Sequence, residues 1–203
     1  MKLVLATQNP KKLEELRALL DLPATDVICA LDIPGIPEVV EDGKTFHENA
    51  VKKAVTLARL TGCWALADDS GLEVEALNNA PGVYSARYAG EPVDYAANNQ
   101  KLMNALHGTS NRRARFRCVI ALSSPQGETR CVEGSCPGLI IETLKGHQGF
   151  GYDPLFQPDG YTQTFAEMEA AEKNRISHRG RALAAAKQAW GALLAKHPES
   201  WPA

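Results

Sequence analysis

Two adjacent carboxylates, Asp68 and Asp69, have the clearest potential for chemistry, because they follow an apolar segment at residues 64–67. Such a run is typical of a buried strand, so we expect both carboxylates at a strand's end. With Glu41, which precedes a helix, they form a set of oxygen ligands suited to Mg2+. Alternation along the strand would let one Asp hold the metal while the other orients a water or a backbone group. The alternative is a turn with solvated acids.

The pattern T-x-N-x-x-K at residues 7–12 follows a short apolar run and opens a helix. Asn9 is expected to cap this helix, with Pro10 at its first position. The N–H groups and dipole of a helix N-terminus favour an anion, to which Lys12 adds charge and Thr7 a donor. The pattern therefore predicts a phosphate site. The alternative is a plain helix cap followed by solvated lysines.

Lys53 lies on the apolar face of a helix expected over residues 45–61, where Thr45 and Glu48 form a capping box. A rotation of about 100° per residue places these residues on that face: Phe46, Ala50, Lys53, Leu57 and Leu60. An inward ammonium requires a carboxylate or a phosphate as its partner. The alternative is that the aliphatic stem passes the edge of the core and the ammonium reaches water.

A cationic cluster surrounds the expected start of the last helix at Ser177. His178 and Arg179 fall in its first turn, and Lys173 comes just before it. Cations oppose the helix dipole at this end, so an electron-rich ligand would compensate.

An aromatic loop precedes this cluster, with Phe150 and Tyr152 beside Gly149 and Gly151. Aromatic rings next to a closely approaching backbone suit a purine base. The alternative is that both rings pack in the core.

Composition narrows the classes of protein. The 203 residues, 44% hydrophobic and 23% charged, suffice for a globular core. The formal net charge of -2 argues against non-specific nucleic-acid binding. Five cysteines without a C-x-x-C pair favour reduced thiols. Neither a signal peptide nor a membrane-spanning stretch is recognised, so we expect a cytoplasmic protein.

Strand and helix patterns alternate early in the chain, and a hairpin with a turn at residues 125–127 follows. A further capping box at Thr164 and Glu167 predicts a short helix. This order of elements predicts an α/β fold, a mixed sheet flanked by helices. The length allows one domain or two packed lobes.

The motifs together resemble one family over residue 3 to about residue 185. They are, in order, Thr7, Asn9 and Lys12; Glu41; Glu48, Asn49 and Lys53; residues 67–71; residues 81–90; residues 149–154; and Lys173 with residues 177–179. This series resembles the inosine triphosphate pyrophosphatase family. The resemblance implies a long mixed sheet in a single domain, residues 1–203, of two lobes with the active site in the cleft between them. It also implies a homodimer, which residues 139–141 could serve.

The resemblance further implies hydrolysis of ITP, dITP and XTP to the nucleoside monophosphate and pyrophosphate with Mg2+. Asp69 would be the general base, and Glu41, Asp68 and Asp69 would hold the metal. The residues that would bind substrate are Thr7, Gln8, Asn9, Pro10, Lys11, Lys12, Lys53, Ser70, Phe150, Gly151, Tyr152, Asp153, Lys173, Ser177, His178 and Arg179. No nucleic acid or membrane partner is implied.

Base selection has a physical explanation in the cationic cluster. Hypoxanthine and xanthine present an acceptor oxygen where adenine presents an amino donor, and Lys173, His178 and Arg179 supply mainly donors. Guanine shares the oxygen, so its exclusion requires a second feature that these residues do not supply. Two other functions stay open: a nucleotide sensor without turnover, and a pyrophosphatase for modified pyrimidine nucleotides.

Overall fold

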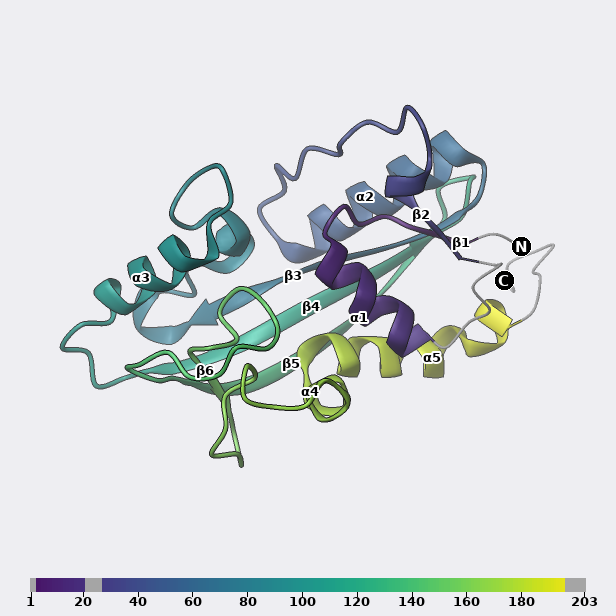
Figure 1. The fold of residues 1–203 in the computed structure, drawn as a ribbon. Helices are drawn as coiled ribbons and strands as arrows, with labels where there is room; N and C mark the ends of the chain where they lie inside the picture. Colours follow the sequence, from purple (N-terminus) through teal and green to yellow (C-terminus); the bar gives the residue numbers. More distant parts are fainter. Residues whose placement is uncertain (1–2, 21–26, 196–203) are drawn as a thin grey trace. The chain divides into compact units, whose positions relative to one another are not determined.

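The computed structural model describes residues 3–20 and 27–195, and within them six strands form one sheet in the order β2-β1-β3-β4-β5-β6. The elements, labelled in Figure 1, are β1 (Leu3–Leu5), α1 (Pro10–Leu20), β2 (Val27–Cys29), α2 (Phe46–Thr61), β3 (Trp64–Val74), α3 (Tyr95–Ala105), β4 (Arg113–Ser123), β5 (Thr129–Ile140), β6 (Phe156–Pro158), α4 (Ala170–Ile176) and α5 (His178–Ala195). β1 is parallel to β2 and β3, whereas β5 and β6 are antiparallel. The sheet is mixed and flanked by helices, which confirms the predicted α/β fold class.

The chain forms two compact units. Unit 1 comprises Met1–Asp69, Val119–Glu133 and Arg181–Ala203, and unit 2 comprises Ser70–Cys118 and Gly134–Gly180. The chain passes from one unit to the other within β3, β4, β5 and α5. In the part of the chain that the structure describes, no helix is both long and apolar enough to cross a membrane.

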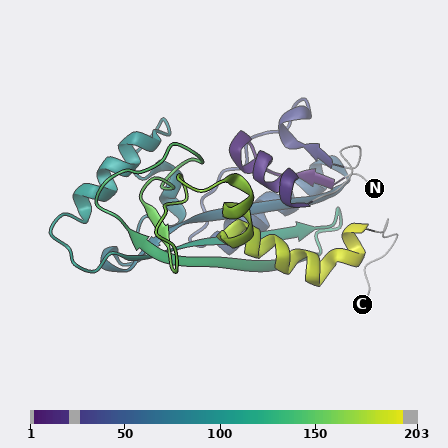
Figure 2. The ribbon, with the colours of Figure 1, turned by 60° about the horizontal axis from the view of Figure 1, so that its bottom comes forward.

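In unit 1 the strand order places α1 and α2 on opposite faces of the sheet. The crossover from β1 to β2 moves in one direction along the sheet, and the crossover from β2 to β3 moves back past β1. Since parallel crossovers are right-handed, the two helices must cover different faces. Figures 1 and 2 show α1 beside α5 on one side and α2 on the other. The carboxyl end of a strand at such a reversal is where α/β proteins usually bind ligands.

β3 is one continuous strand of 11 residues, so the prediction that it ends before Asp68 was wrong. β1 pairs with β3 only as far as Leu66, whose carbonyl accepts a hydrogen bond from the Ala6 amide at 2.8 Å. Asp68 and Asp69 come just after that point and are buried inside the strand. The strand continues beside its neighbour β4, and the buried carboxylates are tolerated because each has a lysine partner, as described below.

The core of unit 2 is built around three phenylalanines. The ring centroids of Phe116 and Phe156 lie 4.7 Å apart, and Phe165 lies 5.9 and 5.0 Å from them. Leu72 and Val74, from the second half of β3, belong to the same buried cluster. β3 thus carries the carboxylates of unit 1, at Asp68 and Asp69, and part of the core of unit 2, at Leu72 and Val74.

Arg112 joins the segment before β4 to the end of β5. Its guanidinium donates hydrogen bonds to the carbonyl oxygens of Ile140 at 2.6 Å, Leu106 at 3.1 Å and Ile141 at 3.2 Å. The planar group with several donors suits three carbonyls at once, which a lysine could not satisfy in the same way. Sequence patterns gave no indication of this role.

The helix predicted at Thr164 does not form. The Thr164 amide donates to the Glu167 carboxylate at 2.8 Å, but its hydroxyl donates to the Lys145 carbonyl at 3.0 Å instead of capping a helix. Residues 165–167 form a turn, and α4 begins only at Ala170. A partner from a distant segment therefore replaced the local capping interaction.

Candidate active site

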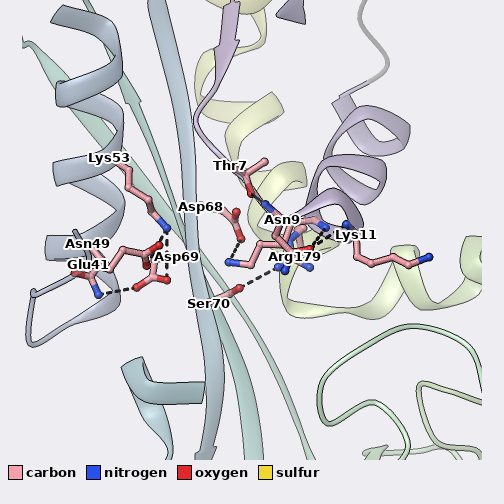
Figure 3. Close-up of polar contacts among 11 residues, drawn as sticks. Thr7, Asn9, Lys11, Glu41, Asn49, Lys53, Asp68, Asp69, Ser70 and Arg179 are labelled. Carbon is pink, nitrogen blue, oxygen red and sulfur yellow. Dashed lines mark hydrogen bonds and ion pairs between the residues drawn. The ribbon is translucent and has the colours of Figure 1, made fainter. Parts of the chain in front are cut away.

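Strand β3 divides the charged residues of unit 1 into two groups, as Figure 3 shows. Asp69 points toward α2, where its Oδ2 accepts a hydrogen bond from Asn49 Nδ2 at 3.0 Å. Its Oδ1 lies 3.7 Å from Lys53 Nζ, which is also 3.1 Å from Glu41 Oε2. Asp68 points to the other side of the strand. Alternation along the strand, as predicted, thus separates the two carboxylates.

Lys53 is directed inward and only 8% exposed, and its ion pairs with Glu41 and Asp69 confirm the predicted anionic partner. The capping box of Thr45 and Glu48 fixes the start of α2, because the Thr45 side chain accepts from the Glu48 amide and the Glu48 side chain accepts from the Thr45 amide. The apolar face ends at Leu57, because Leu60, which we predicted to belong to it, is 55% exposed. The capped helix thus presents Lys53 to Asp69.

The buried Asp69 carboxyl is a weaker acid than usual. The pKa of Asp69 is raised to about 6, mainly by burial of the carboxyl and to a smaller extent by the nearby Glu41 carboxylate. The charges of Lys53 and Lys12 and the hydrogen bond from Asn49 oppose this rise. A carboxylate with a pKa just below neutrality is a suitable proton acceptor for a reaction near pH 7.

On the other side of β3, Asp68 is paired with Lys12. Asp68 is 0% exposed, and its Oδ2 lies 3.3 Å from Lys12 Nζ. Lys12 belongs to the first turn of α1, and its side chain keeps 16% of its surface exposed. The ion pair excludes the alternative that Lys12 is simply a solvated surface residue. The burial of Asp68 and Asp69 excludes the alternative that they are solvated acids in a turn.

The N-terminus of α1 forms as predicted. Asn9 Oδ1 accepts hydrogen bonds from the amides of Lys11 at 2.9 Å and Lys12 at 3.3 Å, and the Asn9 amide donates to Thr7 Oγ1 at 3.2 Å. Pro10 is the first residue of the helix. The residues whose surfaces are exposed here are Gln8, Pro10 and Lys11.

Glu41 and Asp69 are the pair that could hold a divalent cation. Both are carboxylates within 4 Å of the same ammonium group, which shows that they share one small region. Mg2+ usually keeps several waters and uses one or two carboxylates together with substrate phosphates, so two carboxylates fit this ion. No group of three or more His, Cys, Asp or Glu side chains suited to a metal is found among the described residues. The structure does not bring Asp68 to this pair.

In unit 2, Asp153 organises the aromatic loop. Its Oδ2 accepts hydrogen bonds from the Phe150 amide at 2.8 Å and from Lys173 Nζ at 2.8 Å. Gly149, at φ +75°, has no room for a Cβ, which would collide with the Asp153 carboxylate. Lys173 Nζ also lies 5.3 Å from the centre of the Phe150 ring, within the range of a cation–π interaction. One buried carboxylate thus fixes the loop and the lysine together.

Arg179 is the most deeply buried cation of the cluster, at 1% exposed. Its Nη2 donates to Ser70 Oγ at 2.9 Å, which Figure 3 also shows. Its guanidinium carbon lies 5.9 Å from the centre of the Phe150 ring. Arg179 and Lys173 therefore both lie close to the same aromatic ring.

His178 and Ser177 have different surroundings. The His178 ring stacks on Phe116 with a centroid distance of 4.7 Å and an interplanar angle of 13°. Ser177 separates α4 from α5, and its Oγ accepts a hydrogen bond from the Gly180 amide at 3.1 Å. Ser177 thus directly precedes α5, whose first residue, His178, packs against the core.

The two aromatic residues of the loop are not equivalent. Tyr152 is buried in the core, where its hydroxyl donates to the Ser85 carbonyl at 2.9 Å and burial raises its pKa. Phe150 is only half-buried. The alternative prediction of packing in the core therefore holds for Tyr152. Only Phe150 offers a ring surface on which a base could stack. The Gly151 carbonyl between them accepts from Asn99 Nδ2 at 2.9 Å.

Sequence reasoning did not assign a role in the site to Asn49 or Asn99. A signal existed for Asn49, because it lies one helical turn before Lys53 on α2 and therefore on the same face. For Asn99 there was none, since its partner, the Gly151 carbonyl, is far away in the sequence.

Comparison with known families matches residues 3–189 to the model of the Ham1 family. The chain belongs to the Ham1 family. Similar Ham1-family relatives include the dITP/XTP pyrophosphatase of Desulforamulus reducens, which is 57% identical over 90% of this chain and 92% of its own length. The dITP/XTP pyrophosphatase of Geobacter sulfurreducens is 51% identical over 94% and 96%.

Solved structures of the Ham1 family share the fold. The Ham1 protein of Staphylococcus aureus superposes with a TM-score of 0.83 at 38% identity, covering 95% of this chain and 100% of its own. The nucleoside-triphosphatase / dITP/XTP pyrophosphatase of Mycobacterium abscessus gives a TM-score of 0.76 at 45% identity, covering 91% and 98%. These matches agree with the family resemblance predicted from the motifs.

Proposed function

We propose that this Ham1-family chain hydrolyses non-standard purine nucleoside triphosphates, namely ITP, dITP and XTP, to the nucleoside monophosphate and pyrophosphate. The observation that carries the proposal is Asp69, a buried carboxylate with a pKa of about 6 beside Lys53 and Glu41. The names of the relatives, which are dITP/XTP pyrophosphatases, support the choice of substrate.

In this proposal Asp69 is the general base. Its carboxylate takes a proton from the water that attacks the α-phosphorus, and pyrophosphate leaves on the opposite side. Asn49 orients the carboxylate through its hydrogen bond to Oδ2. Lys53 and Lys12 stabilise the negative charge that develops on the leaving pyrophosphate. Thr7 and the amides at the N-terminus of α1 add donors for the phosphates.

Mg2+ is the cofactor that we propose, held by Glu41 and Asp69. When bound, it would neutralise phosphate charge and polarise the phosphoryl oxygens. Oxygen ligands and the small number of carboxylates support this ion over softer metals.

Base recognition is assigned to unit 2. Phe150 supplies a ring on which a purine can stack, and Lys173, His178 and Arg179 supply donors for the oxygen of hypoxanthine or xanthine. Adenine would leave these donors without acceptors, which strongly disfavours its binding. The proposal therefore assigns the triphosphate to residues of unit 1 and the base to residues of unit 2.

A panel of nucleoside triphosphates tests the function. We expect pyrophosphate release from ITP, dITP and XTP with Mg2+, little from ATP or dUTP, and loss of turnover when EDTA removes the metal. Tight binding of ITP without any product would instead identify a nucleotide sensor. A preference for dUTP would identify a pyrophosphatase for pyrimidine nucleotides.

We also propose a cytoplasmic homodimer, as the family resemblance implies. Leu139, the exposed residue of the stretch at 139–141, is 37% accessible, whereas Ile140 is buried in unit 2. Sedimentation equilibrium of the wild-type protein and of Leu139→Glu tests this assignment. A monomeric wild-type protein would contradict it.

The glycines of the aromatic loop provide a matched pair of variants. Gly149→Ala is expected to raise KM for ITP about 10-fold, because the new methyl group displaces the Asp153 carboxylate that holds Phe150 and Lys173. Gly151→Ala shares the positive φ, but nothing lies within 4 Å of its Cβ, so we expect only the strain of the backbone, about 1 kcal/mol. Steady-state kinetics and thermal denaturation compare the two. Equal effects would contradict the role of Asp153.

A further inference from the structure

Asp68 and Asp69 form ion pairs with different lysines, Lys12 and Lys53. Its carboxylate is fully buried and lies 3.3 Å from Lys12 Nζ, on the side of β3 that faces α1. Asp69 and Glu41 lie on the side of α2, at one ammonium group, Lys53. The strand itself separates the two carboxylates, because consecutive residues of β3 face opposite ways.

This separation argues against a metal site made of all three acids. Ligands to one Mg2+ must all reach the same ion at about 2.1 Å. Glu41 and Asp69 share a region, but Asp68 is directed to Lys12. The absence of a three-residue metal group from the described part of the chain agrees with this.

The negative charge of Asp68 stabilises the Lys12 ammonium at the N-terminus of α1. Lys12 begins α1, where the helix dipole is positive, so a cation in this turn is disfavoured by the helix itself. A buried carboxylate offsets that effect and restrains a long, flexible side chain in one position. The lysine still keeps 16% of its surface exposed, so it remains available to a ligand in solution.

We propose that Asp68 is a positioning residue that holds Lys12 for the triphosphate, and that it is not a ligand of the metal. This inference rests on the proposed function, since it assigns a task within the same site. Asp68 acts through Lys12, and the metal is left to Glu41 and Asp69. Of the two adjacent acids of β3, Asp68 thus pairs with the Lys12 ammonium and Asp69 binds the metal ion.

Metal binding separates the two roles without measuring turnover. Titration of Mn2+ followed by electron paramagnetic resonance should give the same affinity for Asp68→Asn as for the wild type. Asp69→Asn, the matched variant one residue away, should bind Mn2+ about 10-fold more weakly. If Asp68→Asn weakens Mn2+ binding as much as Asp69→Asn does, the proposal is overturned.

Phosphate binding tests the link to Lys12. Calorimetric titration with tripolyphosphate in EDTA should show about 10-fold weaker binding for Asp68→Asn, a similar loss for Lys12→Met, and no further loss in the double variant. Additive losses would mean that Asp68 acts independently of Lys12 and would refute the inference. Because neither titration involves a nucleotide, both give an answer even if ITP is not hydrolysed, which would refute only the proposed function.

Discussion

Replacing Asp69 with asparagine is expected to lower kcat for ITP by about 1,000-fold, because the amide cannot accept the proton of the attacking water. The wild-type rate should fall at acidic pH, where the Asp69 carboxylate becomes protonated; burial raises its pKa to about 6, and the Mg2+ that it would hold shifts the loss of rate to lower pH. Asp69→Asn should lose this dependence. The measurement is a pH–rate profile of pyrophosphate release for both proteins, and an unchanged rate in the variant would remove Asp69 from the role of base.

Thermal stability is the control for this variant. The folded-state pKa of Asp69 is above the ordinary value of 3.8, so the folded protein holds the proton more tightly than the unfolded chain. The stability that this proton gives is complete below about pH 4 and is lost as the pH rises through about 6. At pH 8, the neutral side chain of Asp69→Asn should therefore leave the melting temperature equal or higher. A loss of activity caused by misfolding would show the opposite change.

Replacing Lys53 with methionine is expected to reduce kcat/KM for ITP about 100-fold and to move the acidic limb of the pH–rate profile to higher pH. The ammonium of Lys53 is the main charge that lowers the pKa of Asp69, while Glu41 raises it. Without Lys53, the two carboxylates repel each other with less compensation, so Asp69 keeps its proton to a higher pH. The same loss of charge weakens binding of the triphosphate.

Lys52 is the matched control for this experiment. It precedes Lys53 on α2, but its ammonium is on the outside, 2.6 Å from Asp42. Lys52→Met removes the same charge from the same helix and should leave the pH–rate profile unchanged. A shift of the acidic limb in Lys52→Met as large as that in Lys53→Met would mean that the effect is a general one of net charge.

Features that depend on neighbouring residues could be predicted from the sequence. The caps at Asn9 and at Thr45 with Glu48 form because their partners lie within a few residues. The inward direction of Lys53 follows from its place among the apolar residues of α2. For the same reason, the alternation that separates Asp68 from Asp69 could be predicted.

Features that depend on partners far away in the sequence could not be predicted from it. That β3 continues past Asp68 depends on its pairing with β4, a strand much later in the sequence. Tyr152 and Phe150 have similar local sequence, and only the carbonyl of Ser85 places one of them in the core. The site residues themselves were identified through the motifs of a family, which carry information about an assembled site that no local pattern contains. Their pairing required the structure.

The pairing of β1 with β3 fixes which lysine each acid meets. Leu5 now lies opposite Leu66, and three residues later Asp69 faces α2. Removing one residue between Leu66 and Asp68 would reverse the orientation of everything that follows, so that the proton acceptor would be turned toward Lys12. Evolution can therefore vary the identity of the small apolar residue before the acids far more readily than it can vary their count. The number of residues in this part of the strand, rather than their identity, keeps Asp69 facing α2 and Asp68 facing Lys12.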